Sequence, residues 1–132
     1  FIAALLLAAA LGCAHSPPAH EIPASDLGER FELRAGESRR IAGTPAKITF
    51  ERILSDNRCA IDVVCIVAGE ARASFRLDAG PGRTETFTLD TDRNPTAEVG
   101  GFGVSLLSVS PAPRSTVRID PKSYAVELMV TR

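Results

Sequence analysis

Apolar and polar residues alternate along most of the chain after residue 30, which is the pattern of half-buried β-strands. In the segment 71–77, alanine, phenylalanine and leucine occupy every second position, and arginine and serine stand between them. Turns rich in glycine and proline separate such segments, and no stretch after residue 30 repeats its apolar positions at the helical period of about 3.6 residues. The pattern therefore predicts an all-β domain.

The expected fold is a small antiparallel β-sandwich or barrel of about seven short strands. Segments 71–77 and 84–89 should form a hairpin around the turn at 79–82. The run 62–68 is mainly apolar and β-branched, which favours a buried strand, and 90–101 is expected to be a polar loop. The strand segments, in order, are 31–34, 38–41, 47–54, 62–68, 71–77, 84–89, 102–109 and 124–130.

Two of these segments carry a local irregularity. Ile53 falls out of step with Ile48 and Phe50, which predicts a bulge or a twist in the segment 47–54. The adjacent Leu106 and Leu107 imply either burial on both faces or a bulge in the segment 102–109.

The chain begins with an unbroken apolar run from Phe1 to Leu11. The run is shorter than the about 20 residues that a membrane-spanning helix needs, and it has the length of a signal-peptide core. Neither an initiator methionine nor a basic leader precedes it, so the sequence is expected to lack its true start. Residues 1–12 are therefore interpreted as a signal peptide that is truncated at its N-terminus.

The segment Ala10-Leu11-Gly12-Cys13 resembles the lipobox of bacterial lipoproteins. The resemblance implies cleavage before Cys13 and attachment of a diacylglycerol to its thiol, and hence a membrane contact through this lipid. Gly12 and Cys13 match the motif, whereas Ala10 stands where leucine is preferred. Ala14, in place of an aspartate, implies sorting to the outer membrane if the host is Gram-negative. The alternative is an ordinary secretory signal in which Cys13 is incidental.

Residues 13–28 are interpreted as a tether that precedes a β domain at 29–132. The tether is rich in proline and small residues, a composition typical of extended linkers. His15 and His20 are expected to be solvated, because two histidines on a flexible segment make a poor metal site.

The other two cysteines, Cys59 and Cys65, form a pair in a corner between two expected strands. An exported protein meets an oxidising compartment, so a disulfide between them is the favoured interpretation. A zinc site would need about four ligands, and the histidines lie far away on the tether. A redox or nucleophilic thiol would need a positioned base, and the β domain contains no histidine.

The segment 56–71, Asp-Asn-Arg-Cys-Ala-Ile-Asp-Val-Val-Cys-Ile-Val-Ala-Gly-Glu-Ala, resembles a family of small bacterial lipoproteins without an assigned activity. Their pattern is Asp, any residue, Arg, Cys, Pro, a few residues, Val, any residue and Cys, followed by Gly and a small residue. Ala60 stands where the family has proline, and Asn57 stands where serine is common. The resemblance extends from Phe31 to the end of the chain, and it implies a location and a fold but no activity.

Three charged residues of this segment, Asp56, Arg58 and Asp62, are candidates for a recognition patch on a rigid loop. The alternative, which we favour, is that they hold the backbone of the corner, because polar side chains beside tight loops usually bond local groups. Asp56 is expected to accept backbone N–H bonds in the turn, and Arg58 is expected to pair with Asp62 or Glu70.

Composition excludes several functions. A net charge of −1 and scattered arginines predict no nucleic-acid partner. The acidic segment 90–94 lacks the glycine and closing glutamate of an EF-hand, so a flexible acidic loop is favoured over a calcium site. No Ser/His/Asp set can be assembled in the β domain, and no cofactor, metal or enzymatic activity is expected.

The sequence thus predicts a lipid-anchored binding module in the bacterial cell envelope, facing the periplasm or the cell surface. Its partner would be a protein or another envelope component. The alternative is an inhibitor of an exported protease, in which the disulfide loop enters the enzyme's cleft, because a rigid loop loses little entropy on binding.

Overall fold

The computed structural model describes residue 12 and residues 21–132, and the following account is limited to them. These residues form nine β-strands and one short 3₁₀ helix, η1. The elements are β1 (Ala24–Ser25), β2 (Arg30–Arg34), β3 (Ser38–Ile41), β4 (Lys47–Asp56), β5 (Ala71–Asp78), β6 (Thr84–Asp90), β7 (Thr96–Val99), β8 (Phe102–Ser110), η1 (Pro121–Ser123) and β9 (Ala125–Thr131).

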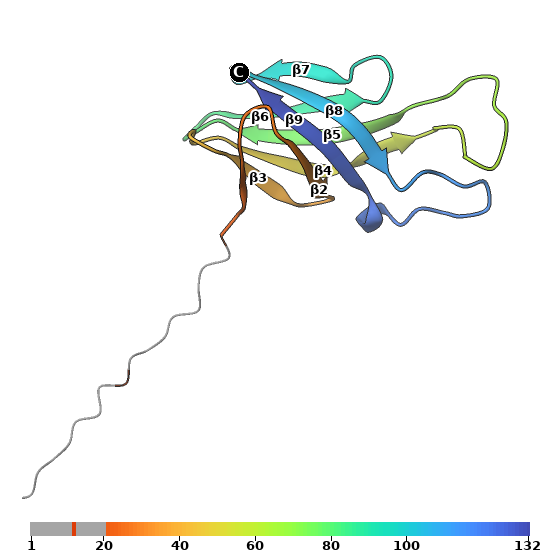
Figure 1. Cartoon of the computed structure of the whole chain (residues 1–132), viewed down its shortest axis with the longest axis horizontal. Helices are drawn as coiled ribbons and strands as arrows, with labels where there is room; N and C mark the ends of the chain where they lie inside the picture. The colour runs from red at the N-terminus through yellow and green to blue at the C-terminus, as the bar shows by residue number, and fades with distance from the viewer. Residues whose placement is uncertain (1–11, 13–20) are drawn as a thin grey trace, which may run out of the picture.

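The strands make two sheets that face each other (Figure 1). One sheet has the order β1-β3-β4-β5-β6, and the other has the order β2-β9-β8-β7. All neighbouring strands are antiparallel except β1 and β3, which are parallel. The predicted all-β fold is confirmed, and of the two expected architectures the structure is the sandwich.

The expected number of strands was too low, because β1 and β7 were not predicted. β1 lies within the expected tether 13–28, and its two residues are too few to show an alternating pattern. The tether therefore ends before residue 24, and the Pro23 carbonyl accepts a hydrogen bond from the N–H of Arg40. β7 lies within the expected polar loop 90–101, where its four residues pair with β8.

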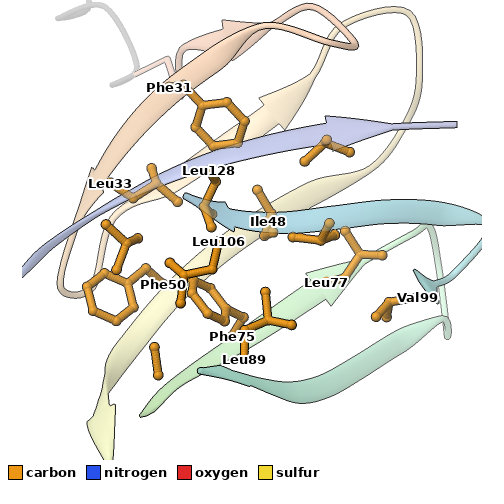
Figure 2. Packing of buried hydrophobic residues seen from close by; sticks show 14 of the residues in the cluster. Phe31, Leu33, Ile48, Phe50, Phe75, Leu77, Leu89, Val99, Leu106 and Leu128 are labelled. Carbon is orange, nitrogen blue, oxygen red and sulfur yellow. The ribbon is translucent and has the colours of Figure 1, made fainter. Parts of the chain in front are cut away.

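The core lies between the two sheets, as Figure 2 shows. The rings of Phe50 and Phe75, on the neighbouring strands β4 and β5, lie 5.5 Å apart between their centroids. Leu33 of β2 and Leu128 of β9 are fully buried in the same cluster. In β2 and most of β9, buried residues alternate with more exposed ones, because one face meets this cluster and the other meets solvent.

Bulges occur in β4 and β8, as the sequence predicted. The register of β4 against β5 shifts between Phe50 and Arg52 and again between Ile53 and Ser55. The register of β8 against β9 shifts between Leu106 and Ser108. A bulge bends the strand and increases its twist. Both strands run toward the same end of the sandwich, where long loops follow them (Figure 1).

Candidate interaction surface

Two loops meet at this end of the sandwich. The disulfide loop, residues 57–70, links β4 to β5, and the second loop, residues 111–120, links β8 to η1. Figure 1 shows both loops extending beyond the ends of the sheets. They are joined through their backbones, because the N–H of Ile61 donates to the Pro113 carbonyl over 2.9 Å.

The two arms of the disulfide loop are held together at its base. The N–H of Asn57 donates to the Glu70 carbonyl over 2.9 Å, and the Cys59 N–H donates to the Ala68 carbonyl over 2.7 Å. The Asn57 side chain also accepts the N–H of Glu70 over 2.7 Å. Gly69 has φ +70°, and a Cβ at this position would overlap the Asn57 carbonyl, so only glycine fits here.

The predicted disulfide between Cys59 and Cys65 is present, and it explains why the predicted buried strand at 62–68 is wrong. The two Cα atoms lie 5.9 Å apart although the cysteines are six positions apart in the sequence. Six residues of extended strand would span about 20 Å, so the chain inside the disulfide ring must fold back. The chain inside the ring turns, and residues 62–68 pair with no strand and are exposed.

A cluster of three side chains attaches the disulfide loop to the sandwich. The guanidinium of Arg58 binds the carboxylate of Asp56 through two hydrogen bonds, Nε to Oδ1 at 2.8 Å and Nη2 to Oδ2 at 2.7 Å. The hydroxyl of Tyr124 donates to the same carboxylate over 2.8 Å. Arg58 also donates to the carbonyls of Val109 and Pro111, over 2.7 Å and 2.9 Å. Arg58 thus connects both loops to the end of β8.

The cluster changes the acidity of its members. Burial acts to raise the pKa of Asp56, but the hydrogen bonds from Arg58 and Tyr124 outweigh it and hold this pKa below its usual value. Burial and the bond to the Asp56 carboxylate raise the pKa of Tyr124 to about 12. At neutral pH the site therefore holds a carboxylate, a guanidinium and a neutral phenol, which favours a structural attachment.

Asp62, the third residue of the predicted recognition patch, bonds the second loop. Its carboxylate accepts the N–H of Ser115 over 2.9 Å and the Ser115 hydroxyl over 2.7 Å. These two hydrogen bonds lower the pKa of Asp62. The structure therefore brings Asp56 and Arg58 together but directs Asp62 elsewhere. The expected pairing of Arg58 with Asp62 or Glu70 is wrong, because both ends of the guanidinium bind the Asp56 carboxylate. The Glu70 carboxylate instead lies 3.6 Å from the guanidinium of Arg72. The expected turn bond of Asp56 is confirmed, since it accepts the Arg58 N–H.

The feature that the sequence interpretation missed is the apolar tip, which we define as Val63, Val64, Ile66 and Val67 of the disulfide loop. Val64 and Ile66 are fully exposed, and Val67 is 74% exposed. Ile61, beside the tip, is 59% exposed. Large aliphatic side chains grouped on one projecting loop are unusual on a monomeric protein, which makes the tip a candidate interaction surface.

Other candidates from the sequence lie elsewhere. Cys13, His15 and His20, like the signal segment 1–11, fall outside the described residues. Asp90, in the segment compared with a calcium loop, is buried. Its carboxylate accepts hydrogen bonds from the backbone N–H groups of Asp92, Arg93 and Asn94. Its carboxylate thus organises the turn between β6 and β7.

Within residue 12 and residues 21–132, no three metal-ligating side chains gather into a cluster. The same residues contain no helix long and apolar enough to cross a membrane. Comparison with protein-family models, with curated proteins and with solved structures found no significant match. The resemblance of the segment 56–71 to small bacterial lipoproteins therefore stays a prediction.

Proposed function

We propose that this protein is an exported, lipid-anchored binding module of the bacterial cell envelope, and that the disulfide loop is its contact surface. The observation that carries the proposal is the apolar tip, exposed on a loop that is braced from several sides. The disulfide closes the tip, hydrogen bonds close the base, and Arg58 and Asp62 attach the loop to its neighbours.

Exposure of the tip is unfavourable for an isolated domain. Burying one valine or isoleucine side chain stabilises a folded or bound state by about 1.5–3 kcal/mol. Val64 and Ile66 are fully exposed, so folding does not gain this free energy from them. A rigid loop loses little conformational entropy when it binds, so most of this apolar free energy is available to a contact. The arrangement therefore supports binding rather than catalysis.

Export and lipid attachment are supported by the lipobox-like segment at Cys13 and by the disulfide, which is typical of oxidising compartments. Mass spectrometry of the protein, produced behind a complete signal peptide in a bacterium, tests this part. We expect cleavage before Cys13 and a mass increase equal to a diacylglyceryl group. An unmodified Cys13, or cleavage at another residue, would contradict it.

A binding assay with isolated envelope membranes tests the contact surface. All nine strands and the core lie within residues 24–131, so a soluble form that begins at residue 14 keeps the described fold. We expect this form to sediment with the membranes, and the double variant Val64→Asp, Ile66→Asp to stay in solution. The matched control is Leu27→Asp, at an exposed leucine (39%) whose neighbour Gly28 bonds Val130 at the end of β9 away from the loop. Equal sedimentation of all three forms would refute the assignment.

A second candidate function, inhibition of an exported protease, is favoured by the same exposed and disulfide-braced loop. Val64 would then enter the specificity pocket of an enzyme that prefers small aliphatic residues. Inhibition constants measured against a panel of exported serine and cysteine proteases, with the Val64→Asp variant as control, separate this candidate from a general binder. Absence of inhibition across the panel at micromolar protein would remove it.

A further inference from the structure

The shape and chemistry of the apolar tip restrict what it can contact. The disulfide loop that carries the tip projects past the sheets (Figure 1), so the occupant must supply either a cleft or a soft surface. The side chains of the tip are aliphatic only, and the chain has no tryptophan. Protein interfaces concentrate their binding energy in tryptophan, tyrosine and arginine, and valine is under-represented there. Hydrocarbon chains of a lipid layer, in contrast, need no directional partner.

Two cationic side chains lie on the second loop, which bonds the disulfide loop at Ile61 and Asp62. Arg114 and Arg118 are exposed, and within the described part of the chain neither guanidinium has a hydrogen bond or an ion pair. Their loop is bound to the disulfide loop at Asp62 through Ser115, the residue after Arg114. A groove of about 420 Å³ between Pro111 and Ser123 is lined by both arginines.

The acidic side chains of the two loops, and Asp56 beside them, are already engaged. Asp62 accepts two hydrogen bonds from Ser115, and Asp120 accepts the N–H of Lys122. Glu70 and Asp56 each lie beside an arginine. The carboxylates of Asp62 and Asp120 thus accept hydrogen bonds from their own loops, whereas the guanidiniums of Arg114 and Arg118 have no such partner in the described structure.

We propose that this end of the domain contacts an anionic lipid surface, with the apolar tip among the acyl chains and Arg114 and Arg118 at the phosphate groups. Combining buried aliphatic area with attraction between cations and anionic lipids is the general physics of peripheral membrane binding. The inference rests on the proposed function and deepens it, because it names lipid as what the contact surface meets. It adds a second membrane contact to the one expected at Cys13.

Vesicle binding of the soluble form that begins at residue 14 tests the inference without the lipid at Cys13. Because the chain has no tryptophan, the variant Val64→Trp places one reporter at a fully exposed position. With vesicles of phosphatidylethanolamine and phosphatidylglycerol, we expect a blue shift of its emission and quenching by brominated acyl chains. Leu27→Trp, at the other end of the sandwich, is the matched control and should show neither effect.

Substitutions assign the two parts of the contact. Removing one fully buried aliphatic side chain weakens an apolar contact by at least about tenfold, so we expect Val64→Asp and Ile66→Asp each to reduce vesicle binding by that factor or more. Arg114→Gln and Arg118→Gln should each reduce binding to anionic vesicles by about fivefold, with no effect on neutral phosphatidylcholine vesicles. Added salt should weaken wild-type binding and leave the double glutamine variant nearly unchanged.

The outcomes separate the inference from the proposed function. Binding to envelope membranes, without binding to protein-free vesicles made from their extracted lipids, would overturn the lipid inference and keep a protein or other non-lipid partner. Sedimentation equilibrium that shows self-association abolished by Val64→Asp would overturn it in favour of a second copy of the chain. Failure to bind either membranes or vesicles would refute both the inference and the proposed contact surface.

Discussion

Replacing Arg58 by methionine removes the group that attaches the disulfide loop to the sandwich while keeping a side chain of similar length. The substitution eliminates two hydrogen bonds to the Asp56 carboxylate and one each to the carbonyls of Val109 and Pro111. Asp56 then keeps only the hydroxyl of Tyr124 and its backbone contact to residue 58.

The size of the effect follows from the burial of the pair. The side chains of Arg58 and Asp56 are 14% and 10% exposed, which places them between two measured classes. Exposed ion pairs contribute at most about 1 kcal/mol, whereas removing one partner of a buried pair costs about 3–5 kcal/mol. We therefore expect Arg58→Met to lower the free energy of unfolding by about 2–4 kcal/mol, which corresponds to a fall in Tm of about 10–20 °C for a domain of this size.

Urea denaturation followed by circular dichroism measures this difference. The control is Arg30→Met, which breaks a 3.4 Å ion pair with Glu127 between side chains that are 73% and 36% exposed. Its expected cost is below about 0.5 kcal/mol. Because the pKa of Asp56 is lowered by folding, its stabilisation is complete above the unfolded value of 3.8 and is lost as the pH falls through the lower folded value. The difference between wild type and Arg58→Met should narrow below pH 3.8. Equal stability losses for Arg58→Met and Arg30→Met would refute the attachment.

Three further predictions concern the loop and its attachment. Gly69→Ala should destabilise the domain by more than Gly82→Ala, for which we expect about 1–2 kcal/mol. Both glycines have φ +70°, but only at Gly69 would a Cβ overlap the backbone of Asn57. Equal losses in urea denaturation would exclude this steric explanation. Cys59→Ser removes the disulfide and should lower the free energy of unfolding by about 2–3 kcal/mol on the chain-entropy model. Thiol titration of the unfolded, unreduced wild type should find neither Cys59 nor Cys65 as a free thiol. Folding raises the pKa of Tyr124 to about 12, so its stabilisation is complete below the usual value of 10 and is lost as the pH rises to the folded value. Ultraviolet titration of this single tyrosine should show the raised pKa in wild type and a lower one in Asp56→Asn, and identical titrations would contradict the contact.

The alternation of apolar and polar residues was sufficient to predict the fold class and most strands. In β5, every second residue from Ala71 to Leu77 is buried, so the sequence period and the burial pattern coincide. The bulges in β4 and β8 were also visible, because Ile53 and the adjacent leucines break the period. Short edge strands escaped detection, since two residues at β1 cannot display a period.

The disulfide was predicted from the number of cysteines, but its consequence for the segment 62–68 was not. Apolar residues are buried only where another element covers them, and hydrophobicity alone does not say whether such an element exists. Here the short ring between Cys59 and Cys65 turns the chain out of the sheets, so Val64 and Ile66 are exposed although their sequence is that of a buried strand.

The sequence by itself thus determined the all-β class, the main strand segments and the cysteine pair, because these depend on periods and spacings within a few residues. Only the tertiary structure decided that Arg58 binds Asp56 and the end of β8, that Asp62 binds Ser115, and that the apolar tip is exposed to solvent. These contacts join residues 50 or more positions apart, with the exception of the Asp56 pair. The packing of the two sheets determines which distant backbone groups a charged side chain contacts, and the local sequence does not predict them.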